Sequence, residues 1–235
     1  MLRAVVFDLD DTLYPERVYV ESGFRAVAVW TEQHLGVPAQ RAYAFLLGLF
    51  EAGVRGDTFD RFLKSEGVER DGWVPRMVRV YREHEPRIAS YPEVPELLGR
   101  LRARLRLGLV TDGQSAVQRG KMAALGLAPS FDAVVYNDEF GRRAWKPSPR
   151  GFQIVLERLG VEARAAVYVG DNPVKDFLGA RGAGMSTVRV RSPLGLYSRR
   201  EPVSPRHAPE AEITELRELE AVLERVSEWM GKDSK

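Results

Sequence analysis

The chain has 235 residues, of which 44% are hydrophobic and 29% charged, a composition typical of a globular protein with a buried core. Its formal net charge is only +2, which argues against a protein that binds nucleic acid through a strong positive field. The sequence contains no cysteine, which excludes disulfides, zinc–thiolate sites and cysteine nucleophiles.

The N-terminal residues and the hydropathy pattern bear on where the protein acts. Too few apolar residues precede Asp8 to form the apolar region of a signal peptide, and no run approaches the length of a membrane span. We therefore expect a cytoplasmic protein without membrane contact, either a monomer or a homodimer.

The first predicted element is a buried strand over Ala4–Phe7 that ends in carboxylates. This apolar, β-branched run is followed by Asp8 and, two residues further on, by Asp10. In open α/β sheets ligands bind at such strand ends. Because two carboxylates there are costly unless a cation or a reaction requires them, Asp8 and Asp10 are the first candidate functional residues.

The next segment, from Pro15 to Ser90, has apolar residues at helical spacing, which predicts four helices. We predict two domains: a helical domain over 15–90, and an α/β domain formed by 1–14 and 91–235. Because the insert directly follows Asp8 and Asp10, we interpret it as a cap over a substrate site. The alternative is a purely structural subdomain. The apolar stripes are Phe24/Val27/Ala28/Leu35, Ala42/Phe45/Leu46/Leu49/Phe50, Phe59/Phe62/Leu63 and Trp73/Met77/Val80/Tyr81.

After residue 91 short strands alternate with helices. Strands are predicted over 105–110, 133–136, 165–169 and 187–190, with helices over 96–104, 116–125 and 149–159. A short edge strand at 212–213 and a closing helix with its apolar stripe over 216–226 follow, and then a frayed tail at 232–235. This alternation predicts an α/β fold with a Rossmann-like parallel sheet that helices cover on both faces.

Further candidate residues follow two of these later strands. Thr111, Asp112 and Gly113 form a turn whose hydroxyl and backbone N–H groups can point at phosphate oxygens, with a glycine that permits close approach. Asp171 follows the strand at 165–169, and we expect it to bind Mg²⁺, which prefers oxygen ligands. Asp176 is expected to hold a metal-bound water or Lys146.

Lys146 lies in the rigid sequence Trp145-Lys146-Pro147, ahead of a predicted helix. A reaction at phosphorus needs a cation that offsets the charges of a carboxylate, a phosphate and the transition state. We interpret Lys146 as that cation, and the alternative is an isolated surface lysine.

Together these segments resemble the four motifs of the haloacid dehalogenase (HAD) superfamily, whose members are mostly phosphatases that form an aspartyl-phosphate. The resemblance implies that Asp8 is the nucleophile and a metal ligand. Asp10 would protonate the leaving oxygen, deprotonate the attacking water and bind the metal through its backbone carbonyl. That proton exchange needs a pKa suited to neutral pH. The matching segments are Asp8-Leu9-Asp10-Asp11-Thr12, Thr111-Asp112-Gly113, Lys146-Pro147 and Gly170-Asp171 with Asp176, and Thr12 is placed beside the metal site.

The function that the resemblance implies is a Mg²⁺-dependent phosphatase. Its substrate would be a small phosphorylated metabolite, such as a nucleoside monophosphate, a phosphoglycolate-like acid or a sugar phosphate. A 2-haloacid dehalogenase is disfavoured by Asp10 and Asp171, because those enzymes typically lack the second aspartate and bind no Mg²⁺. A phosphomutase of the same superfamily remains open. The complete residue set argues against a protein that binds a phosphate ligand without turnover.

Two further interpretations concern residues outside the motifs. Tyr14, Arg17 and Arg55 are candidates for contacts with the remainder of the substrate. A group of arginines surrounds a Pro/Ser-rich segment, and we interpret it as a solvated basic surface, with a partner-binding patch as the alternative. These arginines are Arg189, Arg191, Arg199, Arg200 and Arg206.

Overall fold

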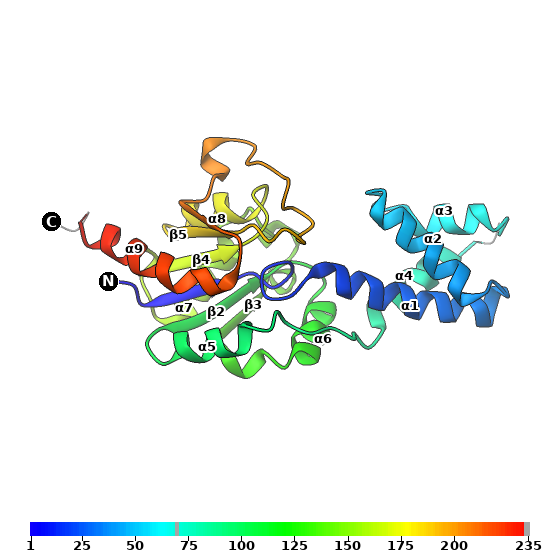
Figure 1. Ribbon diagram of the computed structural model, residues 1–235, viewed down its shortest axis with the longest axis horizontal. Helices are drawn as coiled ribbons and strands as arrows, with labels where there is room; N and C mark the ends of the chain where they lie inside the picture. Colours follow the sequence, from blue (N-terminus) through cyan, green and yellow to red (C-terminus); the bar gives the residue numbers. More distant parts are fainter. Residues whose placement is uncertain (69–70, 233–235) are drawn as a thin grey trace. The chain divides into compact units, whose positions relative to one another are not determined.

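The computed structural model describes residues 1–68 and 71–232 (Figure 1). The chain divides into two compact units, one formed by residues 1–16 and 89–235 and the other by residues 17–88. Most of the tail predicted at 232–235 lies outside the described residues. Within the described ranges, no helix is long and apolar enough to cross a membrane.

The first unit contains a sheet of six parallel strands in the order β3-β2-β1-β4-β5-β6. β1 lies between β2 and β4, with Val5 opposite Leu107 on one side and Val167 on the other. The strand order reverses beside β1, and ligands bind at such a point in open α/β sheets. The predicted fold class is therefore confirmed. The strands are β1 (Ala4–Phe7), β2 (Arg106–Thr111), β3 (Ala133–Tyr136), β4 (Ala166–Gly170), β5 (Ser186–Val190) and β6 (Ala211–Ile213).

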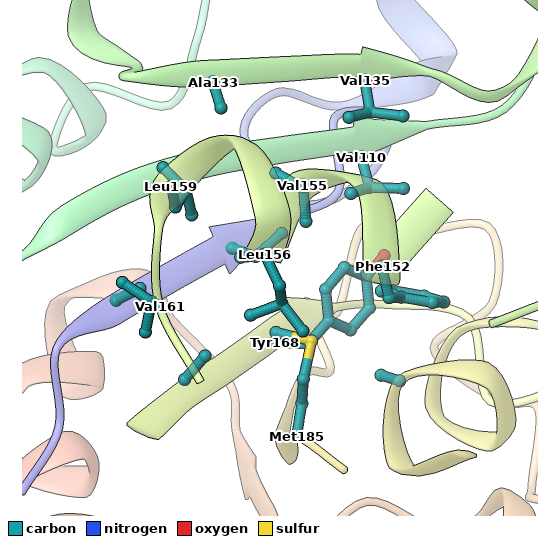
Figure 2. Packing of buried hydrophobic residues seen from close by; sticks show 14 of the residues in the cluster. Val110, Ala133, Val135, Phe152, Val155, Leu156, Leu159, Val161, Tyr168 and Met185 are labelled. Carbon is teal, nitrogen blue, oxygen red and sulfur yellow. The ribbon is translucent and has the colours of Figure 1, made fainter. Parts of the chain in front are cut away.

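Helices pack on this sheet and complete its hydrophobic core. Figure 2 shows Phe152, Val155 and Leu159 of α7 among the apolar side chains of the central strands. Gly108 of β2 lets α7 approach closely, because a Cβ at this position would lie 2.8 Å from Val155 Cγ2. The tight packing holds the carboxyl ends of the strands in place. The helices of this unit are α5 (Val94–Arg102), α6 (Ser115–Leu125), α7 (Arg150–Leu159), α8 (Asp176–Gly182) and α9 (Leu219–Lys232).

The second unit is helical and has its own aromatic core. The ring of Phe24 packs edge-on against the rings of Phe50 and Phe59, at centroid distances of 6.3 Å in both cases. Phe62 and Met77 are fully buried in the same unit. The predicted stripes therefore form the interior of a helical module. Its helices are α1 (Glu16–Leu35), α2 (Ala39–Glu51), α3 (Thr58–Ser65) and α4 (Trp73–Glu83). The first residue of α1, Glu16, still belongs to the first unit.

The arginines of β5 and of the segment after it are not all at the surface, so the interpretation of a solvated basic surface is wrong for Arg189. Its guanidinium is fully buried. It donates hydrogen bonds to the backbone carbonyls of Asp171 (3.1 Å), Tyr197 (2.8 Å) and Arg200 (2.8 Å). A buried arginine can be stabilised in this way because its planar fork satisfies several carbonyls at once. Arg189 thus joins the loop after β5 to the loop after β4.

Candidate active site

The carboxyl ends of neighbouring strands bring the predicted residues of the first, second and fourth motifs together. Asp8 follows β1, Thr111 ends β2 and Asp171 follows β4. The backbone N–H of Asp8 donates to the carbonyl of Val169 at 2.8 Å, which extends the sheet pairing by one residue beyond β1. Asp8, Thr111 and Asp171 are all buried.

Lys146 reaches this group from the segment before α7 and pairs with two carboxylates. Its Nζ lies 2.9 Å from Oδ1 of Asp8 and 2.8 Å from Oδ1 of Asp176. It also donates to the hydroxyl of Tyr168 at 3.0 Å. Burial alone would lower the pKa of Lys146, but the charges of Asp176 and Asp8 outweigh it and raise this pKa. Lys146 is therefore a charged, fully buried lysine rather than a surface one.

Asp8, Asp171 and Asp176 form an acidic cluster, in which each offers a carboxylate oxygen within 4.8 Å of the others. Oδ2 of Asp8 and Oδ2 of Asp171 are buried and have no hydrogen-bond partner among the residues that the structure describes. Burial raises the pKa of Asp8 to about 6 and that of Asp171 well above its ordinary value. Such a cluster suits a hard divalent cation. The cation would offset the repulsion between the carboxylates and would provide a partner for the buried oxygens.

Asp176 is fully buried, and its Oδ1 pairs with Lys146. Its Oδ2 accepts from the backbone N–H of Asn172 at 2.8 Å. Burial would raise the pKa of Asp176, but the charges of Lys146 and Lys175 lower it below the ordinary value. This carboxylate is thereby held ionised at the start of α8.

Asp10 lies in a separate polar environment. Its Oδ1 pairs with Lys121 Nζ at 2.6 Å and accepts from the hydroxyl of Tyr14, and its Oδ2 accepts from Gln118 Nε2 at 2.8 Å. Burial would raise the pKa of Asp10, but these contacts, led by the charge of Lys121, lower it. This corrects the expectation of a pKa suited to neutral pH: the surroundings of Asp10 stabilise the carboxylate form.

Tyr14 has a different position from the one predicted. Its side chain is fully buried and its hydroxyl is used by Asp10. It therefore supports Asp10 instead of offering a polar group to a substrate. Arg17 pairs with Glu21 and Glu51 of its own helical unit, and Arg55 donates to the carbonyls of that unit.

The predicted phosphate turn is tied to its neighbours by side-chain hydrogen bonds. The hydroxyl of Thr111 accepts from Gln118 Nε2 at 2.6 Å. Oδ1 of Asp112 accepts from Asn137 Nδ2 at 2.7 Å and from the backbone N–H of Lys146 at 3.2 Å. Gly113 has φ 110°, a conformation that favours glycine. Asp112 thus connects the turn to the Lys146 segment.

Thr12 and Asp11 differ in how their side chains are satisfied. Thr12, the last residue of the first motif, is fully buried, and within the described part of the chain its hydroxyl has no hydrogen-bond partner. Asp11 has φ 52° and its two oxygens accept from the backbone N–H groups of Glu16 and Leu196, both at 2.8 Å. Asp11 therefore joins the first motif to the start of α1 and to the loop after β5.

Several residues at the site were not predicted. Gln118 and Lys121 lie on α6, which follows the predicted phosphate turn. They are three residues apart, and this spacing could have placed both side chains on the same face of that helix. Lys175 lies between Asp171 and Asp176 in sequence. Its Nζ is 4.0 Å from Asp8 Oδ2 and 3.9 Å from Asp112 Oδ2. Tyr168 lies within the buried apolar strand β4, so nothing in the sequence indicated that its hydroxyl would contact Lys146.

Comparisons with known proteins establish the family. The chain belongs to the haloacid dehalogenase-like hydrolases, which it matches over residues 5–190, so the predicted membership is confirmed. It is 36% identical over 230 residues to glyceraldehyde 3-phosphate phosphatase of Methanopyrus kandleri, and the matched region covers 93% of this chain and 96% of that protein. Phosphoserine phosphatase of Thermus thermophilus is 33% identical over 233 residues, covering 92% and 90%.

Among solved structures, a 2-haloacid dehalogenase from Pseudomonas syringae pv. Tomato DC3000 is similar to this chain. The TM-score is 0.66 at 26% identity, and the match covers 96% of this chain and 99% of that one. Phosphatases and dehalogenases thus share this fold, so the choice between the two activities rests on the residues of the site.

Proposed function

We propose that this protein is a Mg²⁺-dependent phosphatase that hydrolyses a small phosphorylated metabolite through an aspartyl-phosphate on Asp8. The observation that carries the proposal is the acidic cluster of Asp8, Asp171 and Asp176, with buried, unpartnered oxygens on the first two. A dehalogenase has no use for a cation at this position. Transfer of a phosphoryl group does, because its charge must be neutralised.

In this proposal Asp8, Asp171 and the backbone carbonyl of Asp10 hold the metal, with Asp176 and Thr12 beside it. When bound, Mg²⁺ neutralises negative charge on the carboxylates and on the phosphoryl oxygens. The residues of the chain do the remaining work. Lys146 pairs with Oδ1 of Asp8 at 2.9 Å and so fixes the orientation of this carboxylate.

The reaction consists of two displacements at phosphorus. A carboxylate oxygen of Asp8 bonds to phosphorus while the ester P–O bond breaks, and the leaving oxygen takes a proton from Asp10. Water then attacks the aspartyl-phosphate, Asp10 takes the proton of that water, and inorganic phosphate leaves Asp8. Lys121 favours the basic form of Asp10 in the free protein. The negative charge of a bound phosphate ester raises the pKa of Asp10 and so favours the acid form needed first.

The names of the relatives favour a three-carbon substrate within the broader class. Glyceraldehyde 3-phosphate and phosphoserine are both three-carbon phosphate monoesters, and proteins that act on them are 36% and 33% identical to this chain. The motif residues Asp8, Asp10, Thr111, Lys146 and Asp171 are proposed to act on the transferred phosphoryl group, which all candidate substrates share. The choice of leaving group is assigned to the helical unit over 17–88, which would act as a cap. We propose further that the protein acts in the cytoplasm, as a monomer or homodimer.

A substrate panel tests this proposal. The wild-type protein is incubated with Mg²⁺ and each of glyceraldehyde 3-phosphate, phosphoserine, phosphoglycolate, a nucleoside monophosphate and a sugar phosphate, and released phosphate is measured. Parallel reactions with 2-chloropropionate measure chloride release. We expect phosphate from at least one ester and no chloride. Chloride release without phosphate release would assign a dehalogenase, and conversion of a sugar phosphate to its isomer would assign a mutase.

A further inference from the structure

We propose that Gln118 is a positioning residue that holds Oδ2 of Asp10, the atom that exchanges the proton, beside the hydroxyl of Thr111. This inference rests on the proposed phosphatase function and deepens it. It names the oxygen of Asp10 that meets the leaving group, and the side chain that fixes this oxygen relative to the predicted phosphate turn.

The first step identifies the reacting oxygen of Asp10. Each oxygen of a carboxylate can accept about two hydrogen bonds. Oδ1 already has two partners, because it pairs with Lys121 Nζ at 2.6 Å and accepts from the Tyr14 hydroxyl. Across residues 1–68 and 71–232, Oδ2 accepts a single hydrogen bond, from Gln118 Nε2 at 2.8 Å. Oδ2 is therefore the oxygen with room for a proton and for the leaving oxygen of a substrate.

The second step concerns the amide of Gln118, whose nitrogen has two N–H donors. Gln118 Nε2 donates to Asp10 Oδ2 at 2.8 Å and to Thr111 Oγ1 at 2.6 Å, so both donors are used. The two acceptors come from different segments, because Asp10 belongs to the first motif and Thr111 ends β2. A rotation of the amide would break both hydrogen bonds at once, so these contacts fix its orientation.

The third step concerns which of these side chains a ligand can reach. The side chain of Asp10 is 17% exposed, whereas Gln118 is only 1% exposed. A ligand can therefore contact Asp10, but Gln118 lies behind it. Gln118 acts on the reaction through Asp10 and Thr111 and does not touch the substrate itself.

The fourth step concerns the hydroxyl of Thr111, which has one O–H donor besides its acceptor lone pairs. Because Gln118 donates to Thr111 Oγ1, the hydroxyl proton must point toward another acceptor. It points to the carbonyl of Asp112 at 3.4 Å, a long contact. A phosphoryl oxygen is charged and so is a better acceptor for this donor. One nitrogen thus aligns a donor for the phosphoryl group with the oxygen that protonates the leaving group.

Packing against the phosphate turn also holds Gln118 in place. A Cβ at Gly113 would lie 3.2 Å from Cδ and Oε1 of Gln118, so the turn lies directly against the amide. The backbone N–H of Gln118 donates to the carbonyl of Gln114 at 3.0 Å, at the start of α6. Both the backbone and the side chain of Gln118 are therefore fixed relative to the turn.

The position of Oδ2 has a consequence that depends on the leaving group. In the first displacement the proton on Oδ2 of Asp10 bonds to the leaving oxygen as the ester P–O bond breaks. In the second displacement Oδ2 accepts the proton of the attacking water. A strongly basic leaving group needs the first proton more than a weakly basic one does. Loss of Gln118 should therefore slow the cleavage of esters with basic leaving groups selectively.

The test compares the wild type with Q118M, D10N, the double variant and Q153M. Methionine is similar in length to glutamine but has no N–H donor, and Gln153 is an exposed glutamine on α7, away from the site. With Mg²⁺ present, kcat/KM is measured on p-nitrophenyl phosphate and on phenyl phosphate, whose leaving group is more basic. This ratio of constants reports the first displacement. Unchanged circular dichroism spectra verify folding, and Q118N, which withdraws the amide by one methylene, replaces Q118M if Q118M does not fold.

For Q118M we expect kcat/KM on phenyl phosphate to fall about tenfold or more beyond its fall on p-nitrophenyl phosphate, as for a misplaced general acid. The double variant should equal D10N on both esters, because Gln118 acts through Asp10, and Q153M should equal the wild type. An equal loss on both esters in Q118M, or no loss, would overturn this inference and leave the phosphatase proposal intact. A wild type that hydrolyses no phosphate ester would overturn the proposed function and this inference with it.

Discussion

Replacing Gly179 with alanine should damage both stability and activity through the packing of α8. A Cβ at Gly179 would lie 2.4 Å from the carbonyl oxygen of Pro147 and 2.8 Å from Phe152 Cε2, whereas ordinary contact begins at 3.4 Å. The carbonyl is backbone, so α8 and the Pro147 segment must separate by about 1 Å. Such overpacking typically costs about 1–3 kcal/mol, and the better helix propensity of alanine returns about 1 kcal/mol.

The net expectation is a loss of up to about 2 kcal/mol in the free energy of unfolding. Activity should fall more steeply, because Lys146 precedes Pro147 and Asp176 begins α8, so the shift pulls on their 2.8 Å ion pair. We expect kcat to fall about tenfold or more, as for a misplacement of about 1 Å near reacting groups.

Gly182 provides the matched control on the same helix, since a Cβ there would have nothing within 4 Å. Urea denaturation and kcat on p-nitrophenyl phosphate are measured for G179A, G182A and the wild type. G182A should be as stable as the wild type or slightly more stable, with unchanged kcat. If G179A matched G182A in both measurements, the close contact between α8 and Pro147 would not be limiting, and the reasoning would be wrong.

Four further predictions concern the site and its surroundings. Asp8→Asn should lower kcat at least about a hundredfold with an unchanged circular dichroism spectrum, because an amide is a poor nucleophile; a smaller loss contradicts covalent catalysis. Excess chelator should abolish ester hydrolysis, Mg²⁺ should restore it and Ca²⁺ should inhibit, whereas full activity in chelator contradicts the metal proposal. Replacing residues 17–88 by a short linker should leave slow cleavage of p-nitrophenyl phosphate without preference among metabolites; a retained ranking of substrates would place specificity elsewhere. Arg189→Met should cost about 1–3 kcal/mol by urea denaturation, because it removes the donor to the carbonyls of buried Asp171 and of Tyr197 and Arg200, and a cost under about 1 kcal/mol would contradict this.

The arrangement of the loops follows from the order of strands and helices alone. Alternating strands and helices predict a parallel sheet, and in a parallel sheet all carboxyl ends lie at one edge. Asp8, Thr111 and Asp171 could therefore be expected near one another before any side chain was placed. The bounds of β3, Ala133–Tyr136, also agree with those predicted from the sequence. A short apolar run between turn residues leaves few positions at which the strand can begin or end.

The partner of each charged group was decided by the tertiary structure. Lys121 meets Asp10 across 111 positions of sequence, and Lys146 meets Tyr168 across 22. The periodicity of apolar residues in the sequence does not indicate such pairs, because they depend on how α6 and the Lys146 segment pack on the sheet. The pKa of Asp10 is lowered for the same reason: the residue type was visible in the sequence, but the cation beside it was not.

The burial of charged side chains was likewise decided by the tertiary structure. The sequence displays Arg189 among several arginines and Lys175 among several acidic residues, without indicating which side chains water reaches. The fold buries Arg189 among carbonyls of two loops and leaves the side chain of Lys175 31% exposed. Sequence thus determined which kinds of group line the strand ends. Packing decided which of them are paired with each other and which can meet a ligand, because burial and pairing depend on contacts between distant segments.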